Sequence, residues 1–142
     1  MRGIVKFCAQ ECARQKSGAE SVYWMFRAWE EAVADRAMKN GVLEVATILL
    51  LAGLVDPRNK KGVRRQPVVF ANGTQGIDHE EVLPAMERLC KYGQPCDDPG
   101  AFYWALMKIH PFVDGNGRVG SLIYNWDTLD LPGKPPDYFG GE

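Results

Sequence analysis

The sequence of 142 residues predicts an all-α, mainly helical fold. Two observations favour helices. Apolar residues recur three or four positions apart over residues 21–39, and residues 43–54 form a nearly continuous apolar run. The composition, 46% hydrophobic and 25% charged, is that of an ordinary globular protein. A chain of this length can bury about two-thirds of its unfolded surface in one core. We therefore expect a single domain over residues 1–142.

The first half of the chain is expected to hold three helices. A short helix is predicted over residues 4–15. A longer one covers residues 21–39, where Asn40-Gly41 supplies a stop signal. Its Trp24 and Trp29 are expected to pack in the core or in a subunit contact rather than to bind a base. The apolar helix over residues 43–54 should end near Asp56-Pro57, because the residue before proline disfavours the helical conformation.

Three more helices are expected in the second half. Asp78, with Glu81 three residues on, has the form of a capping box that begins a helix running to about Tyr92. An aromatic-rich helix over residues 101–110 should deliver His110 at its C-terminal end. A last helix should follow a Gly-Asn-Gly turn and continue to about Leu129. The tail, residues 132–142, is rich in Gly and Pro and is expected to be irregular.

One segment, about residues 66–77, breaks the helical pattern. Val68, Val69, Phe70 and Ala71 lie in a β-prone stretch, and Asn72-Gly73 is a strong signal for a type I′ hairpin turn. A lone hairpin is unstable in water, so it must lie on the helical body. The segment is therefore predicted to be a small β-hairpin on the surface.

Charge and hydropathy exclude several classes of protein. The net charge of −1 and a pI near 6.1 argue against general nucleic-acid binding, which needs clustered positive charge. No segment offers the roughly 18 apolar residues of a membrane span. The first residues lack the apolar run of a signal peptide. The expectation is a cytoplasmic protein. Its cysteines, at positions 8, 12, 90 and 96, do not follow a zinc spacing and are expected to be reduced thiols.

Residues 110–118, His-Pro-Phe-Val-Asp-Gly-Asn-Gly-Arg, are the most informative stretch for function. Imidazole suits proton abstraction near neutral pH, which makes His110 a candidate base. Asp114 offers the oxygen ligand that Mg²⁺ prefers. Glycines on both sides of Asn116 let the backbone turn its N–H groups toward an anion, and Arg118 adds a fixed positive charge. This chemistry suits nucleotide phosphates.

The same stretch resembles the signature of the Fic family, H-x-F-x-[DE]-G-N-[GK]-R-x-x-R, at every specified position except the last. The resemblance implies a Fic-like helical bundle that transfers AMP, or a related group, from ATP to a hydroxyl of a target protein. It implies that His110 is the general base, that Phe112 holds the loop in the core, and that Asp114 binds Mg²⁺. The hairpin would then be the family's flap, which holds the target polypeptide by strand addition. A plain surface excursion is the alternative.

The resemblance also implies how the nucleotide is held. Its phosphates would be bound by an anion-binding nest, formed by Gly115, Asn116 and Gly117, and by the cation of Arg118. In the Doc-like branch of the family, position 117 is a lysine and the nucleotide is reversed, so that the terminal phosphate is transferred. Gly117 therefore favours the AMP-transferring branch. A Doc-like protein kinase or toxin, or a catalytically silent binding module, stays open as an alternative, and a separate antitoxin or regulator is a possible partner.

The departure from the signature is Ser121, which stands where the family has a second arginine. The resemblance implies that this arginine binds the terminal phosphate of ATP. Serine carries no charge, so some affinity for phosphate should be lost. The family's inhibitory pattern, [ST]-x-x-x-E-[GN], is also missing.

Upstream lies a basic run over residues 58–65, which holds five cations in eight residues. Three interpretations are open for it: a solvated loop, attraction of an acidic target, or replacement of the phosphate contact missing at position 121.

Overall fold

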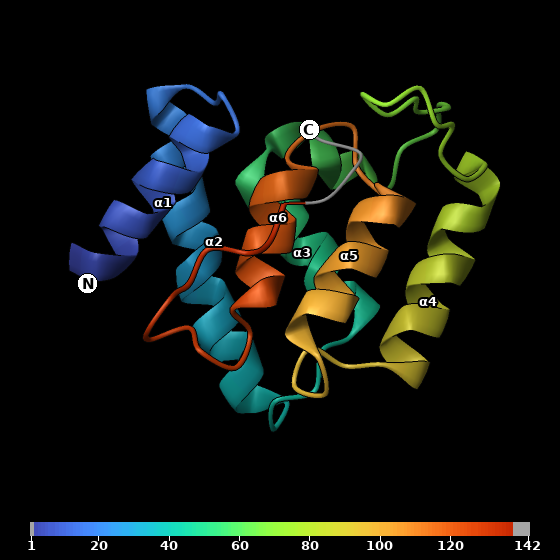
Figure 1. The fold of residues 1–142 in the computed structure, drawn as a ribbon. Coiled ribbons are helices and arrows are strands. Elements are labelled where there is room, and N and C mark those ends of the chain that lie inside the picture. The colour runs from blue at the N-terminus through green and yellow to red at the C-terminus, as the bar shows by residue number, and fades with distance from the viewer. Residues whose placement is uncertain (1, 138–142) are drawn as a thin grey trace.

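The prediction of an all-α fold is confirmed. A computed structural model describes residues 2–137, which form six α-helices and two short 3₁₀ helices (Figure 1). In chain order these are α1 (Arg2–Arg14), α2 (Ala19–Met38), α3 (Val45–Val55), η1 (Pro57–Lys61), η2 (His79–Glu81), α4 (Val82–Tyr92), α5 (Pro99–Ile109) and α6 (Asn116–Tyr124). Within the described part of the chain, no helix is both long and apolar enough to cross a membrane.

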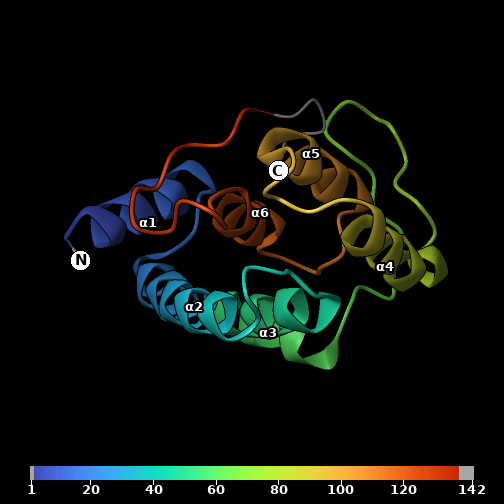
Figure 2. The same ribbon diagram turned by 90° about the horizontal axis from the view of Figure 1, so that it is seen from below.

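Helix α6 lies at the centre of the molecule. Viewed from below, it is surrounded by α1 and α5 at its flanks and by the α2–α3 pair on one side (Figure 2). Residues 116–123 are all buried. Two indole N–H groups tie the surrounding segments together: Trp29 Nε1 donates to the carbonyl of Leu129 at 2.9 Å, and Trp126 Nε1 to that of Gly41 at 2.8 Å. Trp29 is therefore a core residue, as expected.

The last helix is shorter than predicted, because it ends at Tyr124 instead of Leu129. The side chain of Asn125 explains the early stop. Its Nδ2 donates to the carbonyls of Ser121 and Gly133, at 2.8 and 2.9 Å, and its Oδ1 accepts from the Gly133 N–H at 2.6 Å. Side chains that bond nearby backbone in this way compete with the helix. Of the tail, residues 132–137 form no helix or strand, and residues 138–142 lie outside the described residues.

The contact of α6 with α5 requires a glycine. A Cβ at Gly120 would lie 2.4 Å from Met107 Cε and 2.9 Å from Tyr103 Cε1. Gly120→Val should therefore lower the free energy of unfolding by about 1–3 kcal/mol through overpacking. The measurement is urea unfolding followed by circular dichroism. Gly3→Val is the matched control, since Gly3 lies in α1 with no atom within 4 Å of its added Cβ. Equal stability of the two variants would contradict the close packing.

The predicted β-hairpin is wrong in its strands and in its turn. Residues 66–77 form an irregular loop with one antiparallel bridge, between Val69 and Gln75. The turn is closed by the Gly73 N–H on the Phe70 carbonyl at 2.9 Å, one residue earlier in register than a turn centred on Asn72-Gly73. A type I′ turn needs positive φ at both central residues, but only Gly73 of this pair has it. Asn72 instead accepts the Thr74 N–H at 2.9 Å.

The ladder does not extend below this bridge. Its register, set by the Phe70 N–H on the Thr74 carbonyl and the Gly76 N–H on the Val68 carbonyl, would pair Gln66 with Asp78 below it. The guanidinium of Arg64 instead donates to the Gln66 carbonyl, and also to the Ile77 carbonyl, each at 2.8 Å. The arginine thus replaces strand pairing. We call residues 66–77 the flap loop below.

All four cysteines are free thiols. Cys8 and Cys12 lie in the core, and burial raises the pKa of the Cys8 thiol to about 12 and that of Cys90 to about 11. Such thiols are poor nucleophiles near neutral pH, because the reactive species is the thiolate.

Candidate active site

His110 lies at the end of α5 in an unusual backbone conformation. Asp98 caps the start of that helix by accepting the Ala101 N–H at 3.0 Å. At the other end, the His110 N–H donates to the Leu106 carbonyl at 3.0 Å, and His110 itself adopts φ 51° and ψ 62°. This left-handed conformation costs a non-glycine residue about 1–3 kcal/mol, so surrounding contacts must hold it. It turns the chain sharply from α5 into the loop that follows.

Arg64 supplies those contacts. Only 4% of this residue is exposed, and its guanidinium donates to four backbone carbonyls. Nε donates to His110 at 2.7 Å and Nη2 to Ile109 at 3.2 Å, while Nη1 and Nη2 donate to Gln66 and Ile77, each at 2.8 Å. One buried side chain thus joins the end of α5 to both ends of the flap loop.

The imidazole of His110 is oriented by two neighbours. Its Nδ1 lies 3.3 Å from the Met107 carbonyl. A carbonyl only accepts, so this contact places the proton of the neutral ring on Nδ1 and leaves the lone pair on Nε2. Phe70 of the flap loop packs edge-on against the ring, with centroids 5.3 Å apart and planes at 89°. The ring therefore has the form of a base at Nε2.

A pocket of about 310 Å³ opens beside His110. Cations and apolar groups share its lining, which includes His110, Arg58, Lys61, Arg65, Val68 and Val113. None of the described Asp or Glu side chains lines it. The pocket is thus electrostatically suited to an anion.

The loop after His110 is held by amide side chains. Asn116 accepts the Phe112 N–H through Oδ1 and donates to the Phe112 carbonyl through Nδ2, both at 2.9 Å. Asn59 of η1 donates to the carbonyls of Asp114 and Ala52, at 2.8 and 3.1 Å. Phe112 is 2% exposed, in the core position that the motif predicts. Because the Asn116 side chain is used in this way, its part in the site is to close the loop.

Arg118 and Gly115 lie where α6 begins. Gly115 has φ 80°, and an added Cβ would lie 3.0 Å from Val55 Cγ1, so both its conformation and its surroundings require glycine. Arg118 is 4% exposed. Its Nη1 donates weakly to the Val55 carbonyl at 3.4 Å, its Nη2 lies 3.8 Å from Asp114 Oδ1, and its Nε has no partner in the described residues. This buried guanidinium is left with capacity to bind an anion.

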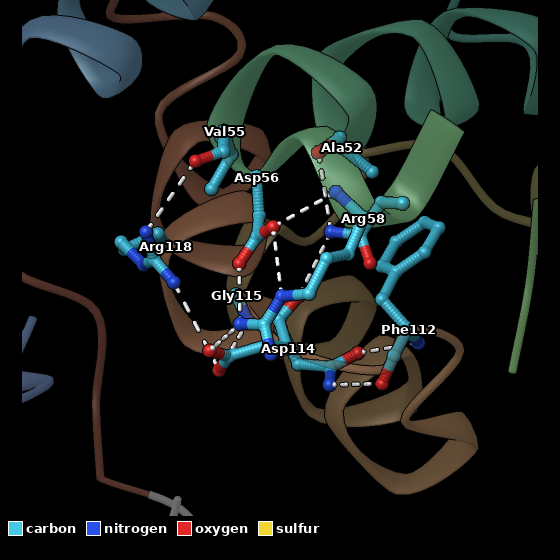
Figure 3. A network of polar contacts seen from close by, with 10 residues as sticks. Ala52, Val55, Asp56, Arg58, Phe112, Asp114, Gly115 and Arg118 are labelled. Atoms are coloured by element: carbon cyan, nitrogen blue, oxygen red, sulfur yellow. Dashed lines mark hydrogen bonds and ion pairs between the residues drawn. The ribbon is translucent and has the colours of Figure 1, made fainter. Parts of the chain in front are cut away.

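Asp114 is joined to a second acid by an arginine that comes from η1 (Figure 3). Arg58 Nη2 lies 2.7 Å from Asp114 Oδ2 and 2.7 Å from Asp56 Oδ2. Arg58 Nε and its backbone N–H also donate to Asp56 Oδ1, at 3.1 and 2.9 Å. Arg58 lowers the pKa of Asp56, which is buried, so Asp56 is ionised at neutral pH. Asp114 is half exposed, and its Oδ1 accepts the Gly115 N–H at 2.8 Å.

Gly117 and Ser121 face crowded surroundings. A Cβ at Gly117 would lie 2.3 Å from Gln15 Oε1, so a side chain at this position fits only if Gln15 moves. Ser121 is fully buried, and its hydroxyl has no partner in the described part of the chain. The hydroxyl of Ser121 is therefore closed off from solvent.

A family model described as the Fic/DOC family matches residues 40–126, which is more than half of the chain. The chain belongs to the Fic/DOC family. The matched region begins after α2, ends at Trp126, and contains the whole site from Asp56 to Arg118. No curated protein matches the chain closely enough for a comparison.

The donor set of this Fic/DOC site fits a Mg²⁺ ion held jointly with phosphates. Within residues 2–137 there is no group of three or more His, Cys, Asp or Glu placed to hold a metal by itself. Mg²⁺ in nucleotide sites usually takes only one or two carboxylates, with phosphates and waters completing the octahedron. Asp114 could supply that carboxylate, because its side chain is half exposed while Arg58 pairs with its Oδ2 and the Gly115 N–H bonds its Oδ1.

Four residues of this Fic/DOC site lie outside residues 110–118, the stretch identified from the sequence: Asp56, Arg58, Asn59 and Arg64. The sequence carries a signal for three of them. Asp56-Pro57 was interpreted as a helix stop, but an Asp followed by Pro is also the N-cap and first residue of a new helix, as in η1. The basic run over residues 58–65 contains Arg58 and Arg64, but it does not indicate which of its cations bond to other groups of the site.

Proposed function

We propose that this Fic/DOC chain transfers AMP from ATP to a hydroxyl of a target protein. Membership of the family indicates a transferase or toxin of the Fic type in general. The observation that carries the finer proposal is the imidazole of His110, which lines a cationic pocket while its Nδ1 is bound to the Met107 carbonyl. A neutral base beside an anion site is what transfer from a nucleotide to a hydroxyl requires.

In the proposed step, His110 Nε2 accepts the proton of the target hydroxyl. The hydroxyl oxygen forms a bond to the α-phosphorus of ATP, and the bond from that phosphorus to the oxygen bridging the α- and β-phosphates breaks. Diphosphate leaves with both bonding electrons. Arg118 and the N-terminus of α6, the positive end of that helix, would stabilise the negative charge of the phosphates. Positioning and charge stabilisation account for most of the catalysis in such transfers.

Asp114 would hold Mg²⁺, which neutralises phosphate charge when it is bound. The acceptor polypeptide would lie beside the pocket along the flap loop, whose Val68 lines it and whose Val69 and Ala71 are exposed. Phe70 has a different part, because it packs on the His110 ring. Gly117 has no side chain, whereas the Doc-like branch has a lysine at this position, and this supports AMP transfer.

The test uses the full chain, a cell lysate and ATP labelled at either the α- or the γ-phosphate. Label from the α-phosphate on protein is the expected result. Label from the γ-phosphate alone would replace the proposal with protein kinase activity of the Doc type. No label from either position, with nucleotide binding retained, would indicate a binding module.

Asp114→Asn should abolish the Mg²⁺ dependence of ATP binding, since it removes the negative charge from the loop while keeping the shape of the side chain. The measurement is calorimetric titration of ATP with and without Mg²⁺. Asp130→Asn, which changes an exposed carboxylate outside the loop, should bind as the wild type does. If Asp114→Asn keeps a normal Mg²⁺ dependence, the metal is held elsewhere.

A further inference from the structure

We propose that Arg58 is a phosphate-binding residue of this site and provides from η1 the positive charge that Ser121 of α6 cannot provide. The inference rests on the proposed function for the identity of the ligand, a nucleoside triphosphate. Its own basis is the geometry of Arg58. Asp56 fixes the guanidinium, which also pairs with Asp114 of the candidate site.

Arg58 is held in place by Asp56. Nε and Nη2 of the guanidinium bind the two oxygens of the carboxylate in a bidentate pair, at 3.1 and 2.7 Å, and the Arg58 N–H adds a third bond at 2.9 Å. Exposed ion pairs contribute little because their long side chains are free to move. Here the acid is buried and forms the N-cap of η1, so the arginine starts from a fixed point. The guanidinium is therefore oriented before a ligand arrives.

The fixed guanidinium lies between the two parts of the site. It lines the pocket beside His110, and its Nη2 is 2.7 Å from Asp114 Oδ2. The arginine side chain is 62% exposed, so a ligand can reach it. If the proposed metal and phosphates displace Arg58 from Asp114, the ion pair with Asp56 still holds Arg58 at the same place. One face of the guanidinium would then be released to donate to a phosphate oxygen.

The charges of the site require such a cation. Asp56 and Asp114 are two carboxylates near the proposed phosphates, and Arg118 is the buried cation on the other side of Asp114. Without Arg58, Asp56 would be left buried and unpaired next to a polyanion, which is strongly unfavourable. Position 121 offers no replacement, since Ser121 is uncharged and fully buried.

The experiment compares binding of Mg²⁺-ATP and of adenosine to the wild type, Arg58→Ala and Arg58→Lys by calorimetry. Arg58→Ala should weaken Mg²⁺-ATP binding by about 10- to 100-fold, the usual effect of losing a charge-assisted hydrogen bond. Adenosine, which has no phosphate, should bind the wild type and the variant equally. Arg58→Lys should recover part of the loss, because lysine keeps the charge but lacks the fork that pairs with Asp56.

The matched control is Arg36→Ala. Arg36 is also an arginine paired with an aspartate, Asp127, at 3.0 Å, but it lies near the C-terminal end of α2 and outside the site. The substitution Arg36→Ala removes the same charge and should leave Mg²⁺-ATP binding unchanged. Thermal unfolding of each variant separates a loss of folded protein from a loss of affinity.

The outcomes distinguish this inference from the proposed function. Equal or tighter Mg²⁺-ATP binding by Arg58→Ala would overturn the inference, and tighter binding would mean that Arg58 only blocks Asp114. If binding weakens as expected but no label is transferred to protein, Arg58 binds phosphate and the proposed transferase activity is wrong. If the wild type binds no Mg²⁺-ATP, both are wrong.

Discussion

Replacing His110 with alanine should lower the rate of AMP transfer by about 10²- to 10⁴-fold, the usual effect of removing a general base. The reason is that the Met107 carbonyl fixes the proton of the ring on Nδ1, which leaves Nε2 to accept the proton of the hydroxyl. Binding of Mg²⁺-ATP should be nearly unchanged, because no phosphate contact is assigned to this ring. The measurement is the initial rate of label transfer at saturating ATP, together with the dissociation constant.

Two controls accompany this variant. His79→Ala removes the other histidine, which lies in η2 and pairs with Asp78 at 3.3 Å, and it should transfer AMP at the wild-type rate. Urea unfolding shows the cost to stability, which should stay within about 0.5–1.5 kcal/mol, the value of the lost edge-on contact with Phe70. Wild-type rates in folded His110→Ala would disprove the assigned base.

Arg64→Met should lower the free energy of unfolding by about 3–5 kcal/mol, the largest loss of stability that we expect from a substitution near the site. Methionine keeps much of the side-chain volume but has no donor. The carbonyls of Gln66, Ile77 and His110 would therefore each lose a hydrogen bond in a part-buried place, and that of Ile109 in a buried one. Because His110 would also lose the contact that holds its left-handed backbone, transfer should fall even at temperatures where the variant is folded.

Chemical unfolding of purified variants measures this effect. Arg65→Met is the matched control, because Arg65 is the neighbouring arginine but is exposed, and its change should stay within about 0.5 kcal/mol. Arg64→Lys should lie between the wild type and Arg64→Met, since an ammonium group cannot reach all four carbonyls. If Arg64→Met and Arg65→Met unfold at the same urea concentration, the network around Arg64 contributes nothing to stability.

The sequence by itself determined the helical fold and the order of chemical groups along the loop from His110 to Arg118. Helices such as α2 and α3 depend on apolar spacing and on stop signals within about 20 residues, and both are visible in the sequence. The residues from His110 to Arg118 are also local, so their order along the chain already places an imidazole, a carboxylate and a guanidinium within one short segment. The family signature is readable for the same reason.

Only the tertiary structure decided what the distant residues do. Arg58 meets Asp114 across 56 positions and Arg64 meets His110 across 46, and no local pattern distinguishes these two arginines from Lys60 and Arg65 in the same run. The flap loop departs from a hairpin for a related reason, because a guanidinium from outside the segment takes the carbonyls at its base. Burial and long-range hydrogen bonds override local turn and strand preferences, since an unpaired buried polar group costs more than an unfavourable propensity.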